Sequence, residues 1–277
     1  MSYLNDCAKI FRLGLPVLVS QIGMIVVGFA DNIMVGHYST DALASASFVN
    51  NLFNLPIFAA LGFSYGLTPL VGALFTNGRP DKIGQVLRAG VLVNIVVSLL
   101  LIAVMGGVYL NLPRLGQPDH LLPIIRPYFL IYMCGMLPIC IFNAFAQWSY
   151  GIRNTAMPMW IMLGANLLNI LGNYILIYGN FGAPELGLTG AGLSTFTARV
   201  LTAVIICGVF FRSPRYKGYA DGYRKLRPEK GTYGNVIRMS WPVSLQMSFE
   251  TAAFSGCAVM CCLLYTSPSP RDPKTSR

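Results

Sequence analysis

The sequence predicts an all-α membrane protein that crosses the bilayer several times. Of its 277 residues, 55% are hydrophobic and only 11% are charged, whereas soluble domains carry about 25% charged residues. Seven apolar runs are each long enough to cross a bilayer, which takes about 20 residues in a helix. The connections between the runs alternate between basic and non-basic, as expected of loops on opposite sides of a membrane.

The seven apolar runs define the predicted spans. We place them at residues 10–35, 43–75, 85–110, 121–148, 158–179, 187–211 and 236–262. The chain is expected to turn at Gly36, after the first span. The second span is long, and Pro56 and Pro69 are expected to break it or to let it tilt, because proline removes a backbone donor. No secretory cleavage signature follows the first run, so we expect it to be retained.

Basic residues occupy every second connection. Lys9 precedes the first span and Arg12 lies in its first turn, and the richest connection joins the sixth span to the seventh. The cations of this connection and of the first residues after it are Arg212, Arg215, Lys217, Arg224, Lys225, Arg227, Lys230 and Arg238. By the positive-inside rule we expect a cytoplasmic N-terminus, and we expect the location to be the bacterial inner membrane, as a multi-pass protein. The basic residues behind the net charge of +10 are concentrated in alternate connections, which indicates membrane topology. No nucleic-acid partner is therefore expected.

Polar groups from three predicted spans lie at similar depth. Asp31 is five residues before Gly36, and Asn173 and Thr195 are six and eight residues from the outer ends of their spans. At 1.5 Å per residue these depths are about 7–12 Å below the outer edge. An ionisable group inside a span costs roughly 2.5–3.5 kcal/mol and faces a cavity or a partner. The shared layer indicates a polar cavity; the alternative is a carboxylate that is merely capped by a neighbouring span.

The fifth span carries an asparagine stripe. Asn166, Asn169 and Asn173 follow one another at spacings of three and four, so they share a helix face. Such a stripe can line an interior polar site. It can equally supply interhelical hydrogen bonds, which are worth about 0.6 kcal/mol each in membrane bundles.

Three further residues are candidates for function. Glu250 lies near the middle of the seventh span. Arg199 in the sixth can serve as a fixed counter-charge, or its long stem can reach toward the interface. Pro16, fifteen residues before Asp31 on the same helix, is a candidate hinge or a tolerated kink.

Metal and disulfide chemistry are not expected. Five of the seven cysteines lie inside apolar runs, where cysteine usually acts as a small hydrophobe. The two histidines, His37 and His120, both fall in connections. We therefore expect no His-based metal site, no catalytic residue and no cofactor.

Several separated motifs resemble the multidrug and toxic compound extrusion (MATE) transporters. The stretch LPVLVSQIGMIVVGFADNIMVGHYSTDALA is similar to the first span of that family, and NLLNILGNYILIYG, GLTGAGLSTFTARV and WPVSLQMSFETAAF to its fifth, sixth and seventh. The family positions matched in the first stretch are Pro16, Gln21, Asp31, Met34, Val35, Gly36 and Leu43. The resemblance covers residues 9–261.

The resemblance implies a fold, an activity and a set of site residues. The fold is twelve helices in two six-helix lobes, of which this chain supplies one lobe and most of helix seven. The activity is export of organic, often cationic, drugs in exchange for H⁺ or Na⁺ by alternating access, with no obligate protein partner. Asp31 matches the acid of the first lobe, and Asn169, Asn173 and Thr195 match its hydrogen-bonding partners. Glu250 matches a NorM-type acid near which Na⁺ would bind, completed by the missing half.

One position departs from part of the family. The DinF-type branch has an aspartate where this chain has Asn173. A proton relay of two acids in the first lobe is therefore not expected here.

These observations divide the chain into four parts. Residues 1–211 are expected to form the six-helix lobe, 212–235 a cytoplasmic basic loop, and 236–261 the start of a second lobe. Residues 262–277 differ in character, and CLLYTSPSPRD, from Cys262 to Asp272, is what a transposon-based sequencing adapter encodes in one frame. We expect an adapter scar there and exclude it from fold reasoning; the alternative is a natural polar tail.

Two other function classes fit the sequence less well. A flippase for lipid-linked oligosaccharides would need a cationic cavity to hold pyrophosphate, and only Arg199 offers a cation at that depth. An intramembrane enzyme would need a catalytic constellation, but the spans contain no HExxH motif and no Ser/His pair. We therefore expect a transporter and not an enzyme.

Overall fold

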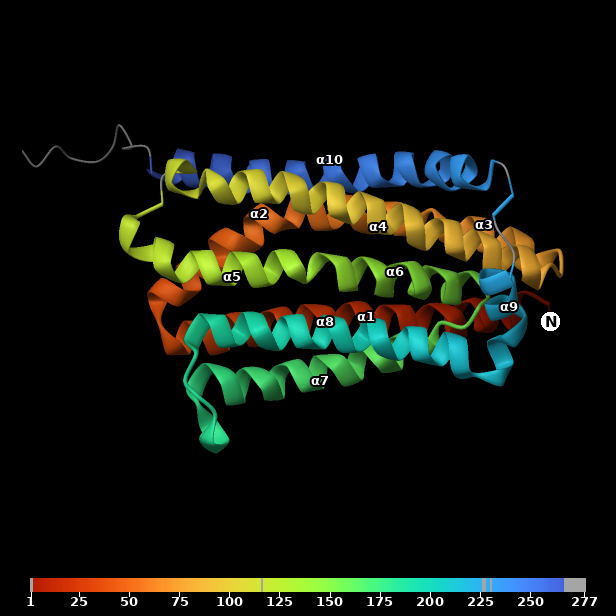
Figure 1. The fold of residues 1–277 in the computed structure, drawn as a ribbon, viewed down its shortest axis with the longest axis horizontal. Coiled ribbons are helices and arrows are strands. Elements are labelled where there is room, and N and C mark those ends of the chain that lie inside the picture. The colour runs from red at the N-terminus through yellow and green to blue at the C-terminus, as the bar shows by residue number, and fades with distance from the viewer. Residues whose placement is uncertain (1, 116, 226–227, 230, 267–277) are drawn as a thin grey trace, which may run out of the picture.

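The computed structural model describes residues 2–115, 117–225, 228–229 and 231–266, and in that part of the chain all regular structure is helical. The helices form a bundle with nearly parallel axes (Figure 1). Their bounds are α1 Ser2–Tyr38, α2 Thr40–Tyr65, α3 Leu67–Thr76, α4 Pro80–Leu110, α5 Leu122–Cys134, α6 Met136–Gly151, α7 Ala156–Tyr178, α8 Gly187–Arg212, α9 Lys217–Lys225 and α10 Thr232–Thr266. Short 3₁₀ turns lie at Leu112–Leu115, Asp119–Leu121, Asn180–Gly182 and Pro214–Tyr216.

Six segments are long and apolar enough to cross a membrane. They are Phe11–Tyr38, Thr40–Thr76, Pro80–Leu110, Asp119–Gly151, Ala156–Tyr178 and Gly187–Arg212. They correspond to the first six predicted spans. Among the described residues no seventh segment is long and apolar enough, so a seventh span within α10 remains a prediction.

Two of the six segments are each made of two helices, and both breaks fall at a glycine. The second span breaks at Gly66 and the fourth at Gly135. Each glycine precedes a proline, Pro69 or Pro138, by three residues. Because proline cannot donate to the carbonyl four residues earlier, the helix loses a hydrogen bond just before the break. The prediction that Pro56 and Pro69 break the second span or let it tilt is met at Pro69, three residues after the break, whereas Pro56 lies inside α2, which continues to Tyr65.

The first turn of the chain also lies later than expected. Gly36 is inside α1, and the chain turns at Ser39. The Ser39 hydroxyl accepts the backbone N–H groups of Asp41 at 3.2 Å and Ala42 at 3.5 Å. This N-cap satisfies donors that the start of α2 would otherwise leave unpaired, and it fixes the reversal between the first two spans.

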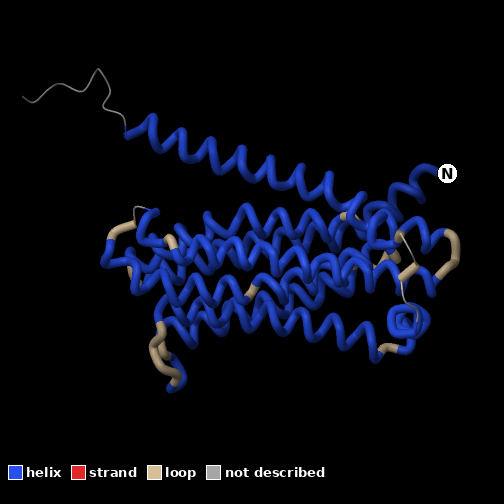
Figure 2. The backbone as a smooth tube through the Cα atoms, turned by 45° about the horizontal axis from the view of Figure 1, so that its top comes forward, coloured by secondary structure: helices blue, strands red, loops and turns tan. Residues whose placement is uncertain are grey.

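Small residues allow α10 to pack closely along α2. A side chain at Gly62 would collide with the backbone of Ser244, and one at Gly66 with Ser240. The Ser244 hydroxyl also donates to the Ala59 carbonyl at 2.8 Å. Close backbone approach through small residues is the usual means of helix association in membranes. Further along, residues 252–257 are exposed, and Figure 2 shows that end of α10 standing apart from the bundle.

Buried apolar residues form two cores, one near each end of the bundle. The first contains Leu67, Ile83, Trp148, Phe210, Tyr216 and Val236, and the second contains Val35, Phe53, Leu112, Phe129, Met136 and Leu188. The first core includes α9, which lies at the same end of the bundle as the N-terminus (Figure 1). The basic N-terminal region and the basic connection that contains α9 therefore lie at one end of the bundle, as the alternation of charge predicts.

Candidate functional site

The candidate site is built around Asp31, a half-buried carboxylate in α1. Helix α1 packs mainly against α7 and also against α2 and α8. From α7, the fully buried Asn173 donates from Nδ2 to Asp31 Oδ1 at 2.5 Å. A hydrogen bond to an ionised carboxylate is short and roughly twice as strong as a neutral one. Asn173 therefore holds the acid toward the interior of the bundle.

Asn169 is the second amide at the carboxylate. An ionised carboxylate only accepts hydrogen bonds, so the amide nitrogen must face it. In that orientation Asn169 Nδ2 donates to Asp31 Oδ1 at 3.1 Å. Its oxygen then accepts from the Thr195 hydroxyl at 3.3 Å and from the Thr195 backbone N–H at 3.2 Å. We assign this orientation because it gives both polar atoms of the Asn169 amide a partner of the right kind.

The amide pair is held in place by close contact between α7 and α8. The Ser194 hydroxyl donates to the main-chain carbonyl of Asn169 at 2.8 Å. A side chain on Gly172 would collide with the same hydroxyl, so glycine is required there for the two helices to approach. Ser194 was not identified from the sequence, although its place beside Thr195 in a glycine-rich stretch is a signal of close helix packing.

The structure thus brings together Asp31, Asn169, Asn173 and Thr195 from three helices. Asn166, predicted on the same stripe, is half-buried, and its Nδ2 makes no hydrogen bond in the described part of the chain. It lies beside Gly23 of α1 and not at the carboxylate. Asn166 is accordingly a packing residue at the interface of α1 and α7.

Arg199, Tyr128 and Tyr132 form a cluster of their own near the carboxylate. The Arg199 guanidinium lies 4.4 Å from the centre of the Tyr132 ring, and it occupies the space left by Gly135 at the break between α5 and α6. Tyr128 donates to Asn50 Oδ1 at 3.5 Å. Both Arg199 and Tyr128 are close enough to interact electrostatically with Asp31. Sequence reasoning missed the tyrosines, although their spacing of four places them on one helix face.

Glu250 and Pro16 lie outside this cluster. Glu250 is exposed on α10, which packs against α2, α3 and α4. Pro16 is inside α1, which is continuous from Ser2 to Tyr38. Since proline has no N–H, the carbonyl of Arg12 loses its usual helical donor. The Pro16 carbonyl accepts an extra bond from the Ser20 hydroxyl at 2.9 Å, so the hydrogen bonding of this turn is irregular.

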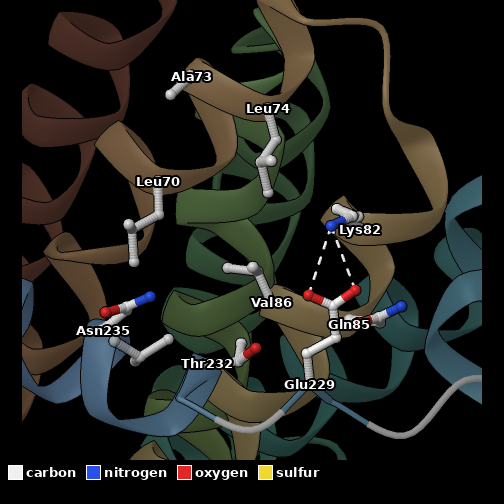
Figure 3. A pocket seen from close by; sticks show the side chains of 10 residues that line it. Leu70, Ala73, Leu74, Lys82, Gln85, Val86, Glu229, Thr232 and Asn235 are labelled. Carbon is white, nitrogen blue, oxygen red and sulfur yellow. Dashed lines mark hydrogen bonds and ion pairs between the residues drawn. The ribbon is translucent and has the colours of Figure 1, made fainter.

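A separate pocket lies at the other end of the bundle, near the start of α10. It has a volume of about 300 Å³ and is lined by Leu70, Ala73, Leu74, Lys82, Gln85, Val86, Glu229, Thr232, Asn235 and Val236. Figure 3 shows the Lys82 ammonium facing both carboxylate oxygens of Glu229, at 3.2 and 3.4 Å. The pocket includes no residue of the Asp31 cluster. In the described residues no three His, Cys, Asp or Glu side chains are grouped as a metal site would require.

Comparisons with known proteins agree with the fold. A probable multidrug resistance protein NorM from Photorhabdus laumondii is 32% identical over 242 residues, which is 84% of this chain and 51% of that protein. A second, from Oceanobacillus iheyensis, is 27% identical over 93% of this chain and 58% of that protein. The chain thus spans about half the length of the curated relatives it matches.

Solved structures share the helical arrangement. The crystal structure of MATE in the bent conformation superposes with a TM-score of 0.75 at 21% identity, over 89% of this chain and 54% of that chain. A MOP superfamily transporter from Pyrococcus furiosus also gives 0.75, at 18% identity over 86% of this chain and 52% of that one. The MatE family model matches residues 16–175, a range that contains Asp31 and both amides that bind it. The chain belongs to the MatE family of multi-pass membrane transporters.

Proposed function

We propose that this chain supplies the first lobe of a secondary antiporter that exports organic cations in exchange for H⁺ or Na⁺ by alternating access. The observation that carries the proposal is the half-buried Asp31 with two amide donors aimed at it. The other carboxylates in the six candidate spans, Asp41, Asp81 and Asp119, all lie in first turns. Asp31 is therefore the acid placed to act within the membrane.

The chemistry requires only that two positive species compete for one negative site. A carboxylate away from bulk water is stabilised by a proton, by a metal cation or by an organic cation. Occupancy by one excludes the others, so loading the site with H⁺ or Na⁺ releases a bound drug. The amides of Asn169 and Asn173 support the ionised state between the two occupancies.

The remaining parts have roles that depend on a second lobe. We place the first lobe at residues 1–211, the inter-lobe connection at 212–235 and the start of the second lobe at 236–261. Glu250 is exposed in this chain, which leaves it open to ligands from a second lobe that would complete an additional Na⁺ site, separate from Asp31 and absent from this chain alone. Pro16 acts as a hinge because its turn already lacks one helical hydrogen bond.

In a plasma membrane, the end of the bundle that carries α9 faces the cytoplasm under this proposal. A cysteine at exposed Gly218 in a cysteine-free background should resist an impermeant reagent in intact cells, and one at exposed Arg114 should react. Gly222 is unsuitable, because it is buried and a side chain there would collide with the Asp81 backbone. Ready labelling at Gly218 would reverse the orientation.

A flippase is the second candidate, because Arg199 places a cation beside the acid. The two functions separate in proteoliposomes that contain a two-lobe protein with this chain as its first half. The antiporter proposal expects efflux of a cationic dye that follows an imposed H⁺ or Na⁺ gradient, with no lipid scrambling above empty vesicles. Gradient-independent scrambling without dye efflux would favour the flippase.

A further inference from the structure

A second pocket lies where α9 crosses α4 and the end of α8. It has a volume of about 400 Å³ and is lined by Arg88, Leu92, Phe211, Tyr223 and Arg224. Two of these five residues are arginines, and the other three are apolar or aromatic. The pocket shares no lining residue with the Asp31 cluster. It is also far from that cluster, because α9 lies at the opposite end of the bundle from the turn that follows Asp31 (Figure 1).

The pocket is at the level of the lipid headgroups. Residues 89–110 of α4 contain no charge, and at 1.5 Å per residue they extend about 33 Å, close to the roughly 30 Å of a hydrocarbon core. Arg88 is the residue immediately before this stretch. The arginines of the pocket therefore lie at the boundary between headgroups and acyl chains.

Local packing fixes the positions of both arginines. Arg88 Nη1 donates to the Tyr223 carbonyl near the end of α9 at 3.4 Å. The Arg224 guanidinium stacks over the Phe211 ring at 4.8 Å. Stacking uses the face of the guanidinium and leaves its edge donors available. Arg224 is exposed, and within the described residues no acceptor is hydrogen-bonded to it.

Close backbone contact makes this a built feature of the fold. A side chain at Gly84 would collide with the backbone of Tyr219 and Tyr223, so α9 lies directly on α4. The carboxylates on these two helices are Asp81 and Asp221. Asp221 is already engaged within the protein. Because the Arg224 guanidinium stacks on Phe211, its edge donors are held in one place. A phosphate group fits the fork geometry of these donors.

An apolar track leads away from the pocket along α4. Leu92, Val96 and Leu100 are 41%, 56% and 62% exposed, and their spacing of four places them on one face of the helix. The track begins at the pocket wall and continues into the hydrocarbon region. A cationic head site that continues into an apolar groove matches an amphiphile with a negative head and an acyl tail.

We infer that this pocket binds an anionic glycerophospholipid, with its phosphodiester on Arg224 and an acyl chain along Leu92 and Val96. Basic pockets at the cytoplasmic ends of membrane helices are suited to such headgroups. The bound lipid would join α9 to α4 and α8, and so stabilise the start of the inter-lobe connection. The inference does not depend on the transported substrate.

The test is native mass spectrometry of the purified chain titrated with phosphatidylglycerol, phosphatidylcholine or inorganic phosphate. We expect bound phosphatidylglycerol and little phosphatidylcholine. Arg224→Ala should lower phosphatidylglycerol occupancy about tenfold, since it removes a charge-assisted hydrogen bond. Arg224→Lys keeps the charge without the planar fork and should be intermediate. Arg215→Ala is the matched control, because Arg215 is an exposed arginine of the same connection outside the pocket.

Three results would overturn the inference. Equal binding of the two lipids would show that the headgroup charge is irrelevant. An equal loss in Arg215→Ala would reduce the effect to general surface charge. Displacement of the lipid by inorganic phosphate alone would identify a free-phosphate site. If thermal unfolding shows that Arg224→Ala does not fold, the phosphatidylglycerol occupancy of Arg224→Lys is compared with that of Arg215→Lys. Equal occupancy in those two variants would then overturn the inference.

Discussion

Replacing Asp31 with asparagine removes one charge and leaves the shape of the site. Asn173 can still donate to the new amide oxygen, so the packing of α1 on α7 should be kept. A unit cation 4 Å from a carboxylate gains about 4 kcal/mol at an effective dielectric constant of 20. Because Asp31 is only half-buried, we reduce this to about 2–3 kcal/mol. At 1.4 kcal/mol per factor of ten, Asp31→Asn should weaken binding of an organic cation by about 30- to 150-fold.

Calorimetric titration of the chain in lipid nanodiscs measures this loss. Tetraphenylphosphonium is the charged ligand, and neutral triphenylphosphine oxide reports apolar contacts alone. Asp31→Asn should lose the first and keep the second. Asp41→Asn is the matched control, since Asp41 is an exposed carboxylate in the first turn of α2, outside the cluster, and it should leave both affinities unchanged. Tetraphenylphosphonium binding by Asp31→Asn at the wild-type affinity would refute the reasoning.

Two further predictions follow from the packing. Asn173→Ala should weaken tetraphenylphosphonium binding less than Asp31→Asn, because it removes one of two amide donors and leaves the charge. Asn166→Ala, on the same face of α7, is the control and should have no effect. An equal loss of affinity in Asn173→Ala and Asn166→Ala would contradict the site. Gly84→Ala should lower the free energy of unfolding by about 1–3 kcal/mol through overpacking against α9. Gly208 faces open space, so Gly208→Ala should not lower it. The two variants are compared by their midpoints of thermal unfolding in detergent, and equal midpoints would argue against tight docking of α9.

The meeting of Asp31 with Asn173 and Thr195 could be predicted from the sequence because helical rise is constant. In antiparallel spans, the distance of a residue from a turn gives its depth, and these three residues lie at similar depths. The depth of Asp31 was counted from Gly36, although the chain turns three residues later, at Ser39. The three residues are nevertheless at similar depths. It could not give the amide orientation of Asn169, which depends on the neighbouring Thr195 backbone.

Contacts that depend on a local break in a helix could not be predicted. The stacking of Arg199 on Tyr132 depends on the break at Gly135, which leaves room for the guanidinium. Nothing in the sequence near Arg199 indicates which helix will present an aromatic ring. The sequence offered only the choice between a counter-charge and a side chain that reaches the interface.

The basic connection was more ordered than its composition indicated. Charge patterning identified residues 212–235 as a polar loop, but α9 forms within it and packs on α4. The signal was the stretch YKGYADGY, in which Tyr216 and Ala220 are buried and Tyr219 and Tyr223 stack against neighbouring aromatic rings. Spacings of three and four in a charged segment are typical of an amphipathic helix.

The central claim is that Asp31 is a single site contested by drug and coupling ion, and the affinity for tetraphenylphosphonium across pH and Na⁺ concentration tests it most directly. The wild-type chain should bind the cation more weakly as either H⁺ or Na⁺ rises, because both compete for the carboxylate. Asp31→Asn should bind weakly at every pH and Na⁺ concentration, with no dependence on either. A wild-type affinity that is constant across both series, or an unchanged dependence in Asp31→Asn, would contradict the account.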